Sequence, residues 1–246
     1  MSGRRRPAQL IVLHSQLASP PPIAVAMIGA RYAPTRVVRA VPRRLYSTGT
    51  PSVVLRRDLE RPLEPPQAKI PITVRPAEAA DGPAISALVA ELSGYDRSNR
   101  ERFLRLGIGT CYVAVTEQGD ICYAQWLIGP EDNALLEQHT TLPRPKPGEA
   151  LLENAFTPAA FRGQGIMSAA MAEIAARGST LGARWVLTVV SERNVPSLKG
   201  CLRAGFEPYM LKLDRWRLFR RDIRYTWLPA GYQLDLAGAA AAHGRA

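Results

Sequence analysis

The chain has 246 residues, 46% of them hydrophobic and 22% charged, a composition typical of one globular domain of ordinary size with an extension. Its formal net charge of +11 would suit a nucleic-acid-binding protein, but residues 1–57 hold ten arginines and no acidic residue, so the remainder is nearly neutral. We therefore expect no nucleic-acid partner. The three histidines are too scattered to form a metal site, and the three cysteines include no C-x-x-C pair and are expected to be reduced thiols.

Residues 1–69 are predicted to be a disordered basic N-terminal extension followed by a proline-rich linker. Three interpretations stay open: a disordered tail or upstream start before Met27, a mitochondrial transit peptide cleaved near residues 43–48, and an electrostatic arm for nucleic acid or a membrane. We expect a cytoplasmic protein, or one of the mitochondrial matrix if the segment is a transit peptide. The apolar run at 23–30 is much shorter than the roughly 20 residues of a membrane span, so no span is expected.

The domain is predicted to cover residues 70–235, with a loose tail at 236–246. A strand is expected at 70–75. Asp81 is expected to cap the next helix, whose apolar residues recur at i, i+3, i+4 and i+7, namely Ile85, Leu88, Val89 and Leu92. The elements that follow are a helix at 98–106, strands at 111–117 and 121–128 around the hairpin signal Gln118-Gly119-Asp120, and a polar insertion at 129–149. The insertion is either a substrate lid or a plain surface loop.

The most informative segment is 151–167. An apolar strand at 151–156 leads into an Arg-Gly-Gln-Gly turn, which opens an Ala-rich helix at 165–177. The first N–H groups of a helix have no intrahelical partners, and glycines let them approach a phosphate that side chains would block. A tight strand-to-helix turn without a ligand would explain the glycines equally well. The turn by itself therefore indicates a pyrophosphate site only weakly, and its context has to strengthen the prediction.

The last predicted elements are a strand at 184–190, a helix at 194–204 that ends at Gly205, and strands at 206–213 and 216–227. The predicted order is β-α-α-β-β-β-α-β-α-β-β. Such an order indicates an α/β fold with a mixed central β-sheet flanked by helices.

Two motifs in this region resemble those of the GNAT superfamily of acetyl-CoA-dependent N-acyltransferases. The family's pyrophosphate motif, Gln/Arg-x-x-Gly-x-Gly/Ala, is matched from Arg162 onward, with Met167 in place of the final small residue. The later family motif, an asparagine followed by a helix and Gly-Phe, is matched by Asn194, Gly205 and Phe206. The resemblance covers roughly residues 70–225 and leaves the first part of the chain unassigned.

This resemblance implies the GNAT fold, acetyl-CoA as acyl donor without a metal, and transfer of the acetyl group to an amine by direct attack in a ternary complex. The backbone N–H groups of the turn would hold the pyrophosphate, the pantetheine arm would pair with the strand end, and Asn194 would contact the cofactor arm. Asn194 is also suited to cap the helix that follows it. The predicted cofactor-binding residues are Phe156, Thr157, Arg162, Gly163, Gln164, Gly165, Ile166, Met167 and Asn194.

Two residues are candidates for proton transfer. Glu153 is a lone carboxylate on the strand that leads to the turn, on one face with Ala155 and Thr157 by the period of two, and could act as general base. It could equally be a solvated or ion-paired structural glutamate. Cys201 occupies the position of a tyrosine that often protonates the leaving thiolate in this family. A thiol could in principle donate a proton there, but Cys201 also belongs to the apolar stripe of its helix.

Two functions remain open at this point. The first is an N-acetyltransferase whose amine acceptor is a small molecule, a protein lysine or a protein N-terminus. The alternative is a non-catalytic GNAT-fold module that binds an acyl-CoA as a sensor or partner, which the missing tyrosine favours. The length of the acyl group and the oligomeric state, including a homodimer, are also left open.

Overall fold

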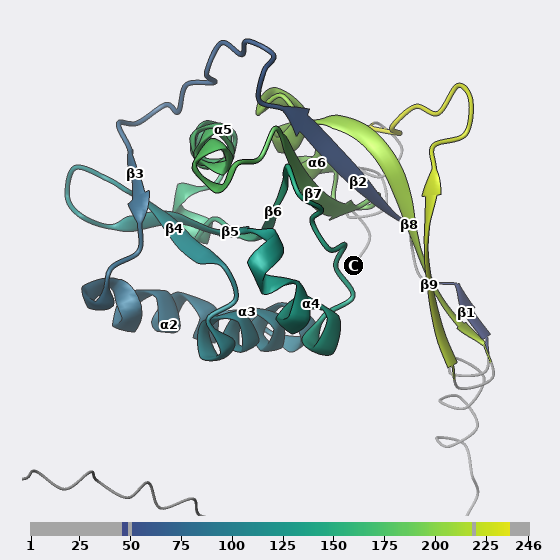
Figure 1. The fold of residues 1–246 in the computed structure, drawn as a ribbon. Coiled ribbons are helices and arrows are strands. Elements are labelled where there is room, and N and C mark those ends of the chain that lie inside the picture. The colour runs from purple at the N-terminus through teal and green to yellow at the C-terminus, as the bar shows by residue number, and fades with distance from the viewer. Residues whose placement is uncertain (1–45, 49–50, 218–219, 237–246) are drawn as a thin grey trace, which may run out of the picture.

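The computed structural model describes residues 46–48, 51–217 and 220–236 (Figure 1). The predictions for residues 1–45 and for the tail beyond residue 236 lie outside the described residues. The described strands are β1 (Tyr46–Thr48), β2 (Ser52–Asp58), β3 (Thr73–Pro76), β4 (Thr110–Val115), β5 (Ile121–Ile128), β6 (Glu149–Phe156), β7 (Trp185–Ser191), β8 (Glu207–Arg217) and β9 (Arg220–Trp227). They form one mixed sheet in the order β1-β8-β2-β7-β6-β5-β4-β3, with β9 paired to β8.

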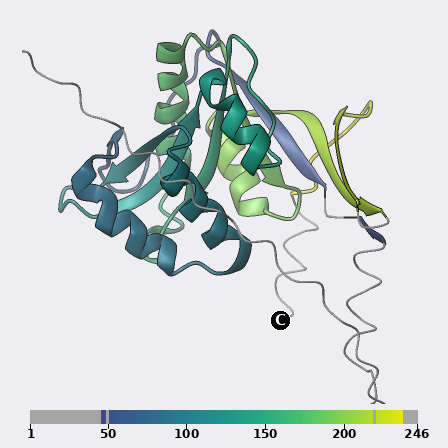
Figure 2. The ribbon, with the colours of Figure 1, turned by 60° about the horizontal axis from the view of Figure 1, so that its bottom comes forward.

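Helices cover both faces of this sheet (Figures 1 and 2). The helices on one face are α2 (Gly82–Ala90), α3 (Gly94–Leu106) and α4 (Asn133–His139), and those on the other are α5 (Ile166–Ala176) and α6 (Val195–Arg203). Short 3-10 helices lie at Ala79–Asp81, Pro130–Asp132, Ala159–Phe161 and Arg177–Leu181. The predicted α/β architecture, with a mixed sheet flanked by helices, is confirmed.

Alternating side chains of the strands build one apolar layer on each face. On β6, Leu151 packs in the layer under α3 and α4, whereas Leu152 packs in the layer under α5 and α6. In the first layer the rings of Phe103 and Trp126 meet edge to face, with 6.2 Å between their centroids. The α5 side holds Met171 and other residues buried almost completely.

Strand β2 corrects the predicted domain boundary. Residues 52–58 were expected in the linker, yet they form an inner strand that pairs antiparallel with both β7 and β8. Val53, Val54 and Leu55 are at most 1% exposed. The prediction that the sheet begins near Ile70 was therefore wrong. The apolar run of β2 is only three residues long and is followed by two arginines, so its sequence did not reveal a buried strand.

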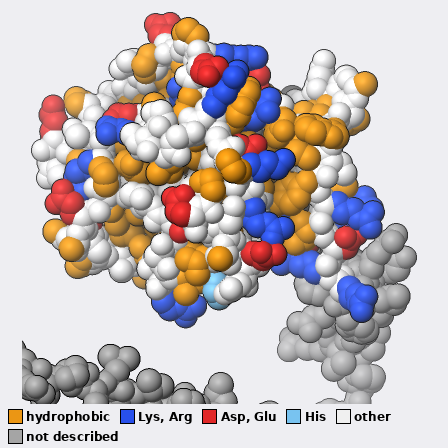
Figure 3. All heavy atoms as spheres, viewed as in Figure 1, with side chains coloured by type: hydrophobic (Ala, Val, Ile, Leu, Met, Phe, Trp, Pro, Cys, Tyr) orange, Lys and Arg blue, Asp and Glu red, His pale blue; other side chains and the backbone are white. Residues whose placement is uncertain are grey.

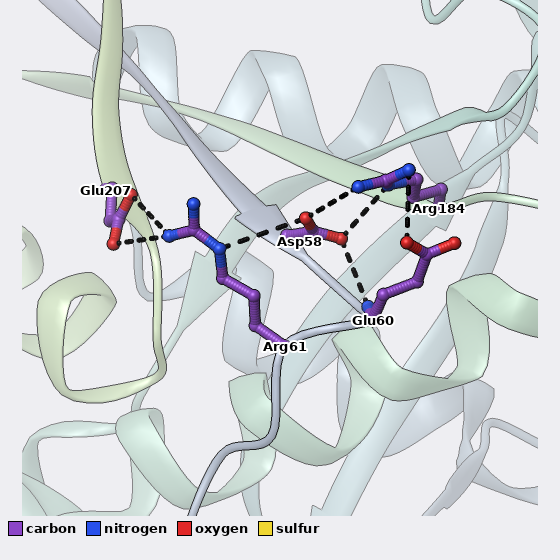
Figure 4. Close-up of polar contacts among 5 residues, drawn as sticks. All are labelled: Asp58, Glu60, Arg61, Arg184 and Glu207. Carbon is purple, nitrogen blue, oxygen red and sulfur yellow. Dashed lines mark hydrogen bonds and ion pairs between the residues drawn. The ribbon is translucent and has the colours of Figure 1, made fainter.

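Charged side chains fasten the end of β2 to its neighbours (Figure 4). Arg184, just before β7, donates to both carboxylate oxygens of Asp58 at 3.3 and 3.2 Å and lies 3.1 Å from a Glu60 oxygen. Arg61 bridges to Glu207 at the start of β8, with 3.2 Å between Nη1 and Oε1. The hydrogen bonds from Arg184 lower the pKa of the Asp58 carboxyl. Exposed pairs contribute little singly, but this network links three strands.

Residues 59–72, here called the crossover segment, run over the outer side of α5 to β3 (Figure 1). The Lys69 N–H donates to the Gln164 carbonyl at 2.8 Å, and Leu63 and Ile70 pack against the core. The prolines predicted to mark a linker thus belong to a packed connection. Two other elements were missed. β1 lies within the predicted disordered extension and pairs with β8, and α4 occupies part of the polar insertion at 129–149. The seven residues of α4 are too few to show a helical period.

Candidate functional site

The parallel strands β6 and β7 separate at the centre of the sheet. They pair only from Glu149 to Leu151 on β6, although β6 continues to Phe156. A bulge explains the separation, because two residues of β6 lie opposite Gln125 alone on β5, and Asn154 has a left-handed φ of 60°. Asn99 on α3 donates to the Asn154 side-chain oxygen at 2.6 Å and holds the bulge. The bulge also interrupts the two-residue alternation of side chains along β6. The prediction that Glu153 shares one face with Ala155 and Thr157 depended on that alternation and therefore does not hold.

A cavity of about 660 Å³ opens beside the separated strands, between the first turns of α5 and α6. Gln164 is absent from its lining, because the Gln164 carbonyl accepts from the crossover segment and its side-chain amide donates to the Ala160 carbonyl at 3.3 Å. The other predicted cofactor-binding residues all line the cavity, namely Phe156, Thr157, Arg162, Gly163, Gly165, Ile166, Met167 and Asn194.

The two glycines of the turn have different roles. Both have left-handed φ angles, 75° at Gly163 and 77° at Gly165. A Cβ at Gly163 would meet no atom within 4 Å, so its backbone is open to the cavity. A Cβ at Gly165 would lie 3.1 Å from the Gln67 carbonyl oxygen of the crossover segment. Gly163 therefore allows a ligand to approach the backbone, whereas Gly165 also allows the crossover segment to pack.

The cavity lining favours an anionic ligand. The first turns of α5 and α6 both border the cavity with the positive ends of their helix dipoles. The free N–H groups belong mainly to α5, because α6 has a proline in its first turn. The Asn194 side chain caps α6 by accepting from the Ser197 N–H at 3.3 Å, so the capping role and the place in the cavity coexist. Basic side chains in the lining outnumber the single acidic one, Asp96; they are Arg100, Arg162, Lys199 and Arg203.

Met167 departs from the small residue of the GNAT motif, and α6 makes room for it. A Cβ at Gly200 would lie 2.9 Å from the Met167 sulfur. The long side chain therefore packs across the backbone of α6 at its glycine. Replacing Gly200 would force Met167 to move.

Glu153 bridges the separated strands. One of its carboxylate oxygens accepts from the Val189 N–H of β7 at 2.9 Å, and the residue is only 9% exposed. Burial raises the pKa of Glu153 to about 7, against the opposing effects of the Val189 hydrogen bond and the positive charges of Lys212 and Arg100. Within the described residues it forms no ion pair at 4.0 Å or less. A carboxyl that titrates near neutral pH suits a general base.

Cys201 lies in a different setting. Its side chain is 1% exposed in the core beneath α6, and it is absent from the cavity lining. Burial, and then the Glu153 charge, raise the pKa of the Cys201 thiol to about 12. Donating a proton to a thiolate whose own pKa is about 8.5 would be uphill. This placement favours a packing role for Cys201.

Sequence reasoning did not select Arg100, which lies on α3. It is 8% exposed and lines the cavity, and its Nη2 donates to the Ala155 carbonyl at 2.8 Å. Its Nε is buried without a hydrogen-bond partner among the described residues. In sequence, Arg100 belongs to a charged helix that resembles a solvated face, so only the fold reveals its contact with the strand end.

None of the helices described has the length and apolar character needed to cross a membrane. Among the residues that the structure describes, no group of three or more His, Cys, Asp or Glu side chains could hold a metal ion.

Comparison with solved structures shows the fold. The chain is similar to the GCN5-related glucosamine N-acetyltransferase region of a fungal multi-domain GH3 β-N-acetylglucosaminidase, with a TM-score of 0.52 and 14% identity over 75% of this chain and 23% of that one. It is also similar to a GCN5-related N-acetyltransferase from Sphaerobacter thermophilus, with a TM-score of 0.49 and 17% identity over 80% of this chain and 58% of that one. A GNAT-family acetyltransferase from Colwellia psychrerythraea matches with a TM-score of 0.48 and 13% identity over 78% of this chain and 61% of that one.

The match thus spans less than two thirds of each of these structures. No protein-family model and no curated protein matches the chain. The chain has the GNAT fold, which the resemblance of its motifs predicted.

Proposed function

We propose that this protein is an N-acetyltransferase, which moves an acetyl group from acetyl-CoA to an amine by direct attack in a ternary complex. The observation that carries the proposal is the position of Glu153 across the gap between β6 and β7. Glu153 is absent from the lining of the neighbouring cavity, which the helix starts make favourable for an anion, but Ala155 and Phe156 of the same strand line it. Acetyl-CoA would supply the activated thioester. The chain's own groups bind the donor, orient the amine and accept its proton.

Donor binding depends mainly on backbone groups. The N–H groups at the start of α5, with Gly163 open beside them, face the place where a pyrophosphate would lie. Because β6 and β7 separate after Leu151, the edge of β6 that faces β7 near Phe156 has no strand partner and can pair with an extended pantetheine arm. Arg162 is held at the rim by its hydrogen bond to the Thr157 carbonyl at 3.1 Å.

Proton removal falls to Glu153. A lysine-like amine has a pKa of about 10.4, so freeing it at neutral pH costs about 4.6 kcal/mol unless a base assists. With its pKa raised to about 7 by burial, Glu153 accepts a proton more readily than an ordinary carboxylate does. Its hydrogen bond to Val189 fixes the carboxylate in the gap, where it would take the proton from the amine directly or through a water molecule.

The test combines binding with turnover. Calorimetry should detect binding of acetyl-CoA, and a panel of amines should contain at least one that stimulates release of free CoA thiol. Glu153→Gln should keep the affinity for acetyl-CoA, lower kcat, and lose the rise in rate through about pH 7 that titration of the base produces. Acetyl-CoA binding without thiol release for any amine would favour the non-catalytic module instead. Absence of acetyl-CoA binding would refute both.

A further inference from the structure

Lys212, on β8, is a buried cation that forms no ion pair with any of the described residues. It is 8% exposed, and its ammonium group donates to the Thr141 hydroxyl at 2.9 Å. Within the described part of the chain, no carboxylate lies within 4.0 Å of it. Asp214, two residues further along β8, is held by Arg221 through hydrogen bonds of 2.9 and 3.2 Å. Buried ammonium groups are normally paired, because burying an isolated charge is costly.

The sheet places Lys212 on the same face as Glu153. The Glu153 carboxylate binds Val189 on β7, Val189 pairs with Val54 on β2, and Val54 pairs with Met210 on β8. Lys212 follows Met210 by two residues and so points to the same side. Val54, Val189 and Met210 pack in the apolar layer of that face. An apolar floor therefore extends from the carboxylate to the ammonium group. Val54 is 1% exposed and lies at the base of this floor, whereas Val189 and Met210 are half-buried and form its upper side.

The two charged groups act on each other without touching. Burial lowers the pKa of Lys212, and the Glu153 charge opposes that effect. Among the described residues, no ion pair of 4.0 Å or less joins the two side chains. Tyr225, the strand partner of Lys212 on β9, donates to the Thr141 carbonyl at 2.9 Å and so fixes the loop whose Thr141 hydroxyl binds Lys212. Figure 3 shows basic side chains around a hydrophobic patch where the β8–β9 hairpin leaves the body.

We propose that Lys212 binds a carboxylate of the acceptor, so that the acceptor is a small amino-carboxylate. Its amine faces Glu153, its carboxylate pairs with the Lys212 ammonium, and its apolar part lies on the half-buried side chains of Val189 and Met210. This inference rests on the proposed function, in which Glu153 receives the amine proton. It disfavours a lysine inside a protein chain as acceptor, because such a lysine has no carboxylate close to its amine.

Matched acceptors test the inference in the full-length protein. Leucine, β-alanine and γ-aminobutyrate are compared with their primary amides by thiol release from acetyl-CoA. For at least one pair, kcat/KM for the carboxylate should exceed that for the amide roughly tenfold or more, since a charged hydrogen bond contributes about 1.5–3 kcal/mol. Lys212→Met should abolish this preference by raising KM for the carboxylate, with KM for acetyl-CoA unchanged. Lys212→Arg should restore part of it. Lys146→Met, which removes an exposed lysine, should behave like the parent.

Binding gives a readout that does not depend on turnover. The preferred amino-carboxylate should raise the melting temperature of the parent and of Lys146→Met, and its amide should not. Lys212→Met should lose this shift yet melt no lower than the parent, because it removes an unpaired buried charge. Equal use of carboxylates and amides by the parent, or a preference that survives in Lys212→Met, would overturn the inference. If the amino-carboxylate raises the melting temperature in a way that depends on Lys212, but no thiol is released, the carboxylate site is supported and only the proposed function is contradicted.

Discussion

The position of β2 leads to a sharp prediction about truncation. A protein that begins at residue 46 should fold, whereas one that begins at residue 59 should not, because the second deletion removes an inner strand. β2 contributes Val53, Val54 and Leu55, each at most 1% exposed. Burying one such side chain contributes about 1.5–3 kcal/mol, so the three together contribute about 5–9 kcal/mol. Whole domains are stable by only about 5–15 kcal/mol. The deletion would also leave β7 and β8 without the partner between them.

The assay is urea or thermal unfolding followed by circular dichroism, with a point substitution as a finer probe. The protein from residue 46 should show a cooperative transition close to that of the full chain, and the protein from residue 59 should show none. Leu55→Ala should cost about 2–5 kcal/mol, whereas Leu181→Ala, at a leucine that is 39% exposed, should cost no more than about 0.5 kcal/mol. A cooperative transition in the protein from residue 59, with acetyl-CoA still bound, would refute this reasoning about β2.

Three further predictions concern single residues of the site. Gly163→Asp should abolish acetyl-CoA binding in calorimetry, whereas Gly163→Asn should retain most of it. The aspartate and asparagine side chains have the same shape and both tolerate a left-handed φ, so they differ mainly in charge. Equal affinities of the two variants for acetyl-CoA would place the pyrophosphate elsewhere. Burial raises the pKa of Glu153 from 4.5 to about 7, so the folded state binds the proton more tightly and stability falls as pH rises between these values. Glu153→Gln should therefore be more stable than the parent by up to about 3 kcal/mol at about pH 8 and equally stable near pH 4. A difference in unfolding free energy that stays constant across that pH range would contradict the raised pKa of Glu153. Cys201→Ala should cost about 1–2 kcal/mol in unfolding with little change in kcat, and a folded but inactive variant would restore Cys201 as the proton donor.

Local patterns were enough to predict the elements whose structure depends on neighbours in sequence. The strand at Ile121–Ile128 was predicted with its observed bounds, and α5 and α6 were each predicted within one residue at either end. The turn from Arg162 to Gly165 was selected as a phosphate site because it and the later Asn194, Gly205 and Phe206 together resemble the GNAT motifs. In each case the residues that decide the structure lie within one turn or one strand of each other.

Features that depend on distant partners could not be predicted in this way. β2 is stabilised by strands that follow it by more than a hundred residues, so its own three apolar residues gave too weak a pattern. The bulge at Asn154 arises from pairing with β5 and from Asn99 on α3, neither of which the sequence of β6 indicates. Lys212 lies in a strand of mixed polarity, and only the hairpin and the loop at Thr141 bury it.

The same strand that stabilises the fold also shapes the acceptor side of the site. Val54 belongs to β2 and lies between Val189 and Met210, so the N-terminal strand supplies the middle of the floor that separates Glu153 from Lys212. Removing or shifting β2 would change the distance between the carboxylate and the ammonium group even if the cavity at the start of α5 survived. Loss of turnover with retained acetyl-CoA affinity is therefore the expected effect of mild damage to β2, such as Val54→Ala. Damage to the turn at Gly163 should instead affect acetyl-CoA affinity first, because that turn belongs to the cavity and not to the floor.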